Sequence, residues 1–94
     1  MLEKDIVSTI MRYLKTVPEC FAWKTHGSQY GLAGIPDIIA CVAGRFYAFE
    51  VKRPVNKLTK IQEVSIQRIN DAGGKAYKVT SLAEVQIILS TSEV

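Results

Sequence analysis

The feature that most constrains this chain is a pair of apolar runs, 37–42 and 45–52, whose polar residues gather at one end. Both runs are rich in aliphatic and aromatic residues, which is typical of β-strands. A short glycine-containing connection joins them and predicts an antiparallel hairpin. Strand side chains alternate between faces, so Glu50 and Lys52 point the same way, and Asp37 falls opposite the end of the neighbouring strand. We therefore expect these three side chains to converge at one end of the hairpin.

Two carboxylates from neighbouring strands suit a hard divalent cation. Mg²⁺ takes one or two carboxylates together with water and substrate phosphate oxygens. The backbone carbonyl of Val51 would add a third protein oxygen, and the ammonium group of Lys52 would orient a water or offset developing charge. The alternative is an exposed ion pair between Glu50 and Lys52, with Asp37 simply following a turn proline. That alternative does not account for all three residues together, because charges inside apolar strands are rarely without a role.

Length and composition limit the class of protein. A chain of 94 residues predicts one small domain spanning 1–94, and 48% hydrophobic residues indicate a globular protein. The net charge of +3 and the pI near 9.0 are compatible with nucleic acid without requiring it. No apolar stretch approaches the roughly 20 residues that cross a bilayer, and the N-terminus lacks a signal-peptide hydrophobic region. We expect an intracellular protein with no membrane contact.

The hydrophobic pattern predicts three helices and four strands. The expected elements are a helix over 2–16, strands over 21–25, 37–42 and 45–52, a helix over 59–72, a strand over 76–80 and a helix over 81–89. Three consecutive strands form a meander and the fourth returns through a helix, which predicts an α/β fold with a mixed four-stranded sheet flanked by helices. Capping boxes open the last two helices, Thr59 with Gln62 and Ser81 with Glu84.

Glu3 and the final helix each allow two interpretations. Glu3 falls within the apolar stripe of the first helix, a local conflict of the kind that functional sites produce. It is equally an acid in a first turn, where the helix dipole favours it and solvent reaches it. The final helix is apolar nearly all round, so it is buried on most sides or meets a partner. We expect one flank of it to face another subunit.

Five residues are candidates for contacts with a nucleic acid. Arg53, Lys57 and Lys60 form a basic cluster that would bind phosphates beside the proposed metal site; the alternative is a solvated basic loop. Lys24 either contacts a phosphate or is a solvated strand lysine. Tyr30 lies in a glycine-rich loop, where it would stack on a base unless the loop is a plain connector.

The motif Gly34-Ile35-Pro36-Asp37, followed by Phe49-Glu50-Val51-Lys52 and Thr59-x-x-Gln62, resembles the PD-(D/E)xK nuclease superfamily. More narrowly, it resembles the virus-type replication-repair nuclease (VRR-NUC) domain, from Glu3 to about Val79. The resemblance implies a restriction-endonuclease-like αβββαβ core, to which the last helix is an addition. It also implies a Mg²⁺- or Mn²⁺-dependent DNA endonuclease of the kind used in DNA repair. By this resemblance, Asp37, Glu50 and the Val51 carbonyl bind the metal. Lys52 assists catalysis, and Gln62 supports the site. Glu3 reaches the metal site through a water or through Lys52.

The resemblance extends to substrate and assembly. Small stand-alone proteins of this kind tend to be homodimers, which suits cutting two strands of branched DNA such as a four-way (Holliday) junction, and a bacterial or phage origin is expected. One alternative is a nucleic-acid-binding module on the nuclease fold that has lost catalysis. The intact set of Asp37, Glu50 and Lys52 argues against it. A second alternative is a metal-independent assembly protein that uses the last helix as its interface.

Overall fold

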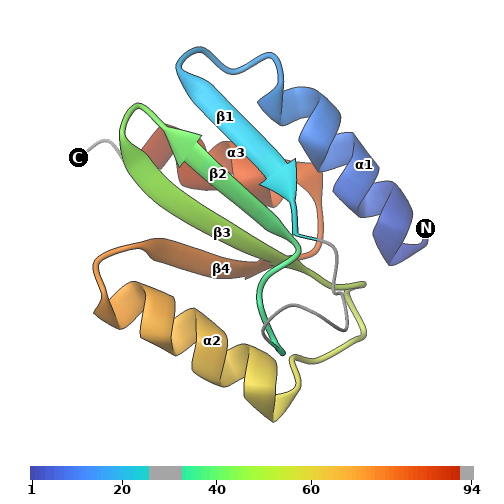
Figure 1. Ribbon diagram of the computed structural model, residues 1–94. Coiled ribbons are helices and arrows are strands. Elements are labelled where there is room, and N and C mark those ends of the chain that lie inside the picture. The colour runs from blue at the N-terminus through green and yellow to red at the C-terminus, as the bar shows by residue number, and fades with distance from the viewer. Residues whose placement is uncertain (26–32, 92–94) are drawn as a thin grey trace.

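A mixed four-stranded sheet carries helices on both faces in the computed structural model, which describes residues 1–25 and 33–91 (Figure 1). The elements in chain order are α1 (Glu3–Leu14), β1 (Cys20–Lys24), β2 (Ile38–Val42), β3 (Arg45–Val51), α2 (Lys60–Asp71), β4 (Lys75–Val79) and α3 (Leu82–Thr91). The strand order is β1-β2-β3-β4, in which only β3 and β4 are parallel. The predicted fold class is confirmed, and the predicted bounds differ from these by at most two residues.

A two-residue turn fixes the register of the central hairpin. Val42 lies opposite Arg45, so only Ala43 and Gly44 connect β2 to β3. Both turn residues have positive φ, 50° and 81°. Positive φ at both positions gives a type I′ turn, whose twist matches that of the flanking strands. This turn therefore sets which residues face each other at the far end of the hairpin.

The starts of α2 and α3 follow the capping signals, one fully and one in part. At α2, the Thr59 hydroxyl accepts the amide of Gln62, and the Gln62 side chain accepts the amide of Thr59, as predicted. At α3, the Ser81 hydroxyl accepts the amide of Glu84 at 3.3 Å. The Glu84 carboxylate, however, accepts the amide and the hydroxyl of Thr80 rather than the amide of Ser81. That half of the second capping box is wrong, because Thr80 offers the carboxylate two donors.

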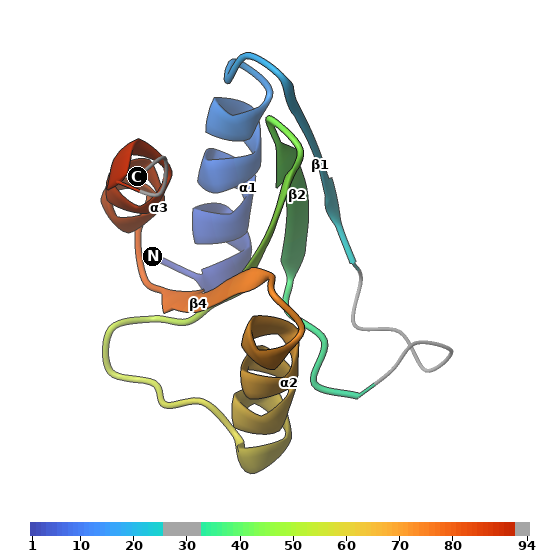
Figure 2. The same cartoon turned by 90° about the vertical axis from the view of Figure 1, so that its left-hand side faces the viewer.

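The two faces of the sheet are covered unequally. Figure 2 shows α1 and α3 together on one side of the sheet, with α2 apart from them. Beneath α1 and α3 lies the main core, whose sheet residues are Ile38, Ala40, Tyr47, Phe49, Val51 and Val79. On the other face, Ile66 and Ile69 of α2 pack on Ile39, Ala48 and Ala76. This smaller core does not extend across β1.

The outer helices bury only part of their apolar surface. α1 buries Ile6, Ile10 and Leu14, whereas Val7 is half-buried. α3 buries Val85 and leaves Ile87 61% exposed. No helix in the described part of the chain is long and apolar enough to span a membrane.

Candidate metal and nucleic-acid site

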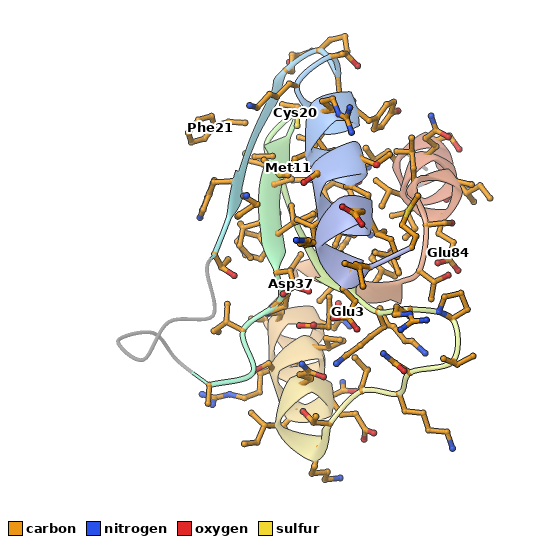
Figure 3. The ribbon with its side chains drawn as sticks, turned by 90° about the vertical axis from the view of Figure 1, so that its right-hand side faces the viewer. Glu3, Met11, Cys20, Phe21, Asp37 and Glu84 are labelled. Carbon is orange, nitrogen blue, oxygen red and sulfur yellow. The ribbon has the colours of Figure 1, made fainter. Side chains whose placement is uncertain are left out.

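The register of the hairpin brings two carboxylates together at its open end. Asp37 stands one residue before β2 and comes opposite Glu50 of β3. The Asp37 carboxylate accepts the backbone N–H of Val51 at 2.8 Å. Its carbonyl accepts the N–H of Thr25 at 2.9 Å, from the end of β1. Asp37 is therefore tied to both neighbouring strands, although it lies outside β2 itself (Figure 3).

Glu50 is the buried member of the pair, with 4% of its surface exposed. Burial is the largest cause that raises its pKa, to about 8, and the Asp37 carboxyl adds to this through a hydrogen bond and its charge. The charge of Glu3 acts in the same direction, while Lys52 lowers the pKa. Glu50 thus holds a proton at neutral pH, because burial disfavours its charged form and Lys52 does not offset the charges of Asp37 and Glu3. A site with this excess of negative charge favours a cation of higher charge than the single ammonium group of Lys52.

Gln62 connects the start of α2 to this pair. Its side-chain oxygen accepts the N–H of Thr59 at 2.9 Å. Its side-chain nitrogen donates to Oε2 of Glu50 at 3.4 Å. Because the oxygen is committed to the helix cap, the amide can only present its NH₂ group to the carboxylate. Gln62 therefore both caps α2 and contacts the Glu50 carboxylate.

The oxygen atoms at the end of the hairpin fit a hard cation. In an extended strand, the N–H and C=O of one residue project toward the same neighbouring strand. The Val51 carbonyl therefore faces Asp37, as the Val51 N–H does. Two carboxylates and a carbonyl are ligands that Mg²⁺ and Mn²⁺ prefer. Within residues 1–25 and 33–91, no three His, Cys, Asp or Glu side chains form a group that could hold a metal ion. A cation here would therefore be held by the carboxylate pair together with the main chain.

Glu3 lies at the same end of the sheet but outside that pair (Figure 3). Its carboxylate accepts the side-chain amide of Asn56 at 3.2 Å, which ties α1 to the connection between β3 and α2. The influence of Glu3 on Glu50 is electrostatic. Glu3 also lines a cleft of about 490 Å³ together with Lys24 and Asp37. The structure therefore brings Lys24 and Glu3 to the mouth of the site.

The residues of the predicted basic cluster lie on the connection from β3 to α2 and on the first turn of α2. Arg53, Lys57 and Lys60 are all exposed. Arg53 lines a separate cavity of about 550 Å³ with residues of α1 and the start of α3. Lys60, by contrast, lies in the first turn of α2. Tyr30, the remaining candidate, lies outside the described residues.

The positioning roles of Gly34 and Asn56 were not predicted. Gly34 has a φ of +80°, and a Cβ there would lie 2.3 Å from Cγ2 and 2.8 Å from the carbonyl oxygen of Ile61. The segment before Asp37 thus packs directly on the first turn of α2. Gly34 belongs to the Gly-Ile-Pro-Asp motif, which was a signal for this role. Asn56 sits in a polar connection with no signal that it would meet Glu3.

Comparison with solved structures identifies the fold. A structure described as "VRR_NUC domain" matches with a TM-score of 0.80 at 20% sequence identity, covering 96% of each chain. A "VRR_NUC domain protein" matches with a TM-score of 0.75 at 18% identity, covering 96% of this chain and 86% of its own. Neither a protein-family model nor a curated protein matches the sequence. The chain has the fold of VRR-NUC domains, so the resemblance in its motifs is confirmed at the level of the fold.

Proposed function

We propose that the protein is a Mg²⁺- or Mn²⁺-dependent endonuclease that hydrolyses phosphodiester bonds in DNA. The observation that carries the proposal is the pair of Asp37 and Glu50, which lie opposite each other at the open end of a hairpin in a VRR-NUC fold. The fold supports a nuclease, and the carboxylate pair supports the requirement for a divalent cation. The Val51 carbonyl completes a set of three protein oxygens.

The mechanism assigns a separate task to each side chain. A cation held by Asp37, Glu50 and the Val51 carbonyl would supply Lewis acidity at the phosphate and a lowered pKa for water. Lys52 donates hydrogen bonds that orient the attacking water and stabilise negative charge on the phosphate oxygens. Gln62 donates to Glu50 and keeps its carboxylate in one orientation. Gln62 is thus a positioning residue.

We further propose that a homodimer acts on branched DNA such as a four-way junction. The exposed Ile87 of α3 supports an apolar contact between copies. A two-fold dimer presents two identical active sites, which suits paired cuts in opposite strands. Lys24, at the mouth of the site, supplies a positive charge for a backbone phosphate.

Cleavage of a labelled four-way junction tests the proposal. We expect cutting with Mg²⁺ or Mn²⁺, no cutting with a chelator, and no cutting by Asp37→Asn, which keeps an oxygen to accept the Val51 amide. Binding of the junction should persist in that variant. Asp71→Asn, at the far end of α2, is the matched control and should cut as the wild type does. Junction binding without cutting at any metal concentration would instead identify a non-catalytic module.

A further inference from the structure

An aromatic pair projects from the sheet face that α2 leaves uncovered. Phe21 is 72% and Trp23 is 43% exposed. Their rings are in contact, with centroids 5.5 Å apart and planes inclined by 41°. Figure 3 shows Phe21 pointing away from α1. Burial of such rings stabilises a small domain, so two of them side by side on the surface indicate a binding surface.

The strand register aligns this pair with the carboxylates. Trp23 lies opposite Ile39, which lies opposite Ala48, so all three share one face. Glu50 follows Ala48 by two residues and therefore faces the same side, one row further along. Successive rows on one face are about 7 Å apart. Trp23 is thus one row, and Phe21 two rows, from the row that contains Glu50.

A nucleobase is the partner that this position favours. Base stacking on an exposed aromatic ring stabilises complexes with single strands and tolerates any sequence, since every base has a π-face. Lys24, next to Trp23 in the chain, points to the opposite face and lines the cleft with Asp37. Neighbouring residues of one strand therefore offer a ring for a base and a charge for a phosphate. A nucleic-acid strand carries both groups, a base and a phosphate, on each nucleotide.

We propose that Phe21 and Trp23 form a stacking platform for unpaired bases of the DNA strand that is cut at Asp37 and Glu50. The inference rests on the proposed function, because the adjacent metal site is what identifies the occupant as DNA. Base faces are hidden inside a continuous duplex, so the platform selects DNA that has unpaired nucleotides next to the scissile phosphate. Flaps and opened branch points have this property.

Trp23 is the only tryptophan of the chain, so its fluorescence reports directly on the platform. The full chain is titrated with single-stranded oligothymidylate in a chelator, where no cutting occurs. We expect saturable quenching of the emission by the single strand, and little quenching by a blunt duplex at the same concentration. The absence of quenching by the single strand overturns the inference.

Variants test whether the rings carry the affinity. Phe21→Leu should weaken binding of a dye-labelled single strand about fivefold or more, measured by anisotropy. Trp23→Leu should do the same, whereas Trp23→Phe keeps a ring and retains binding. Phe46→Leu is the matched control: Phe46 is 45% exposed on the same face, but β2 separates it from the pair. Equal weakening in Phe46→Leu, or none in Phe21→Leu, overturns the inference.

Further measurements separate this inference from the proposed function. Circular dichroism confirms that each variant is folded. If the wild type cuts a junction with metal while Phe21→Leu binds single strands normally, the platform is wrong and the nuclease stands. If Trp23 is quenched by single strands but no DNA is cut, the platform stands and the nuclease is wrong. If light scattering shows that Phe21→Leu dissociates a dimer, the face is a contact between copies, which overturns the inference.

Discussion

Glu50 occupies a strand position where burial favours an apolar side chain, between Phe49 and Val51, and yet it carries a carboxyl. A buried carboxylate destabilises the folded protein unless a cation or donors compensate it. The described surroundings supply one amide from Gln62 and the charge of Lys52, against the charges of Asp37 and Glu3. A proton fills the deficit in the metal-free protein. The metal-free protein is thus more stable with a neutral Glu50. The proposed activity, in contrast, requires an ionised Glu50 that binds a metal.

The pKa of Glu50 predicts how the stability of the metal-free protein depends on pH. The carboxyl titrates near 4.5 in the unfolded chain and near 8 in the folded protein. The folded state therefore holds the proton more tightly, and this contribution to stability is complete below pH 4.5 and is lost as the pH rises through 8. Glu50→Gln is neutral at every pH. We expect the melting temperature of Glu50→Gln to rise relative to the wild type between pH 5 and pH 8; a constant difference would contradict the shift.

Metal binding should stabilise the wild type by competing with that proton. A ligand that binds only the folded state raises the melting temperature, and deprotonated carboxylates bind metal better. We expect a larger upward shift with Mn²⁺ at pH 8 than at pH 5.5. Asp37→Asn should abolish most of the shift, while Asp71→Asn should keep it. An equal shift in both variants would place the metal elsewhere on the protein.

At the scale of elements, the start of α2 combines two tasks in one side chain, and these can be separated by mutation. Gln62→Glu keeps an oxygen for the Thr59 amide but replaces the donor to Glu50 by a carboxylate. We expect little change in stability and a loss of activity of about 10–100-fold, with a higher metal requirement. Thr59→Ala removes a cap and costs about 1 kcal/mol of stability, and it should leave the metal requirement unchanged. The same metal requirement in Gln62→Glu and the wild type would show that Gln62 only caps the helix.

The contact between Gly34 and α2 makes a second prediction for an element. Alanine at Gly34 would combine a positive φ with a Cβ too close to the Ile61 backbone. Alanine at Gly44 has a similar φ of +81°, but no atom lies within 4 Å of the added Cβ. We expect Gly44→Ala to cost about 1 kcal/mol of stability and Gly34→Ala to cost roughly 1–3 kcal/mol more. Urea unfolding measures both, and equal costs would show that Ile61 moves aside easily.

The features that could be predicted from the sequence depend on neighbours along the chain. Side-chain alternation and the short connection placed Asp37 opposite the end of the neighbouring strand, and local side-chain chemistry placed the cap at Thr59. The features that could not be predicted depend on how elements pack in space. The contact of Asn56 with Glu3 joins residues 53 positions apart. Phe21 is exposed because α2 does not extend over β1. No local sequence pattern predicts how far a helix extends across a sheet.

At the scale of the whole molecule, four segments distant in the sequence supply the site. The start of α1 supplies Glu3, the segment before β2 supplies Asp37, the end of β3 supplies Glu50, and the start of α2 supplies Gln62. Each of these residues contacts or electrostatically influences another of the set. The docking of α1 and α2 onto the sheet therefore sets the electrostatic surroundings of the carboxylate pair.

Whether two copies assemble determines whether a domain of this size cuts one or both strands of branched DNA in a single encounter. A single site cuts one strand for each encounter, whereas two sites related by a two-fold axis cut both strands before the complex dissociates. We predict that light scattering gives twice the chain mass of 10.4 kDa. Ile87→Glu places a charge on the exposed flank of α3, so it should give a monomer that keeps the circular dichroism spectrum of the folded protein. On a supercoiled plasmid with a cruciform, the wild type should produce linear DNA and Ile87→Glu should produce nicked circles. Linear product from a monomeric Ile87→Glu would contradict coupled cutting, because it would show that each strand is cut in an independent encounter.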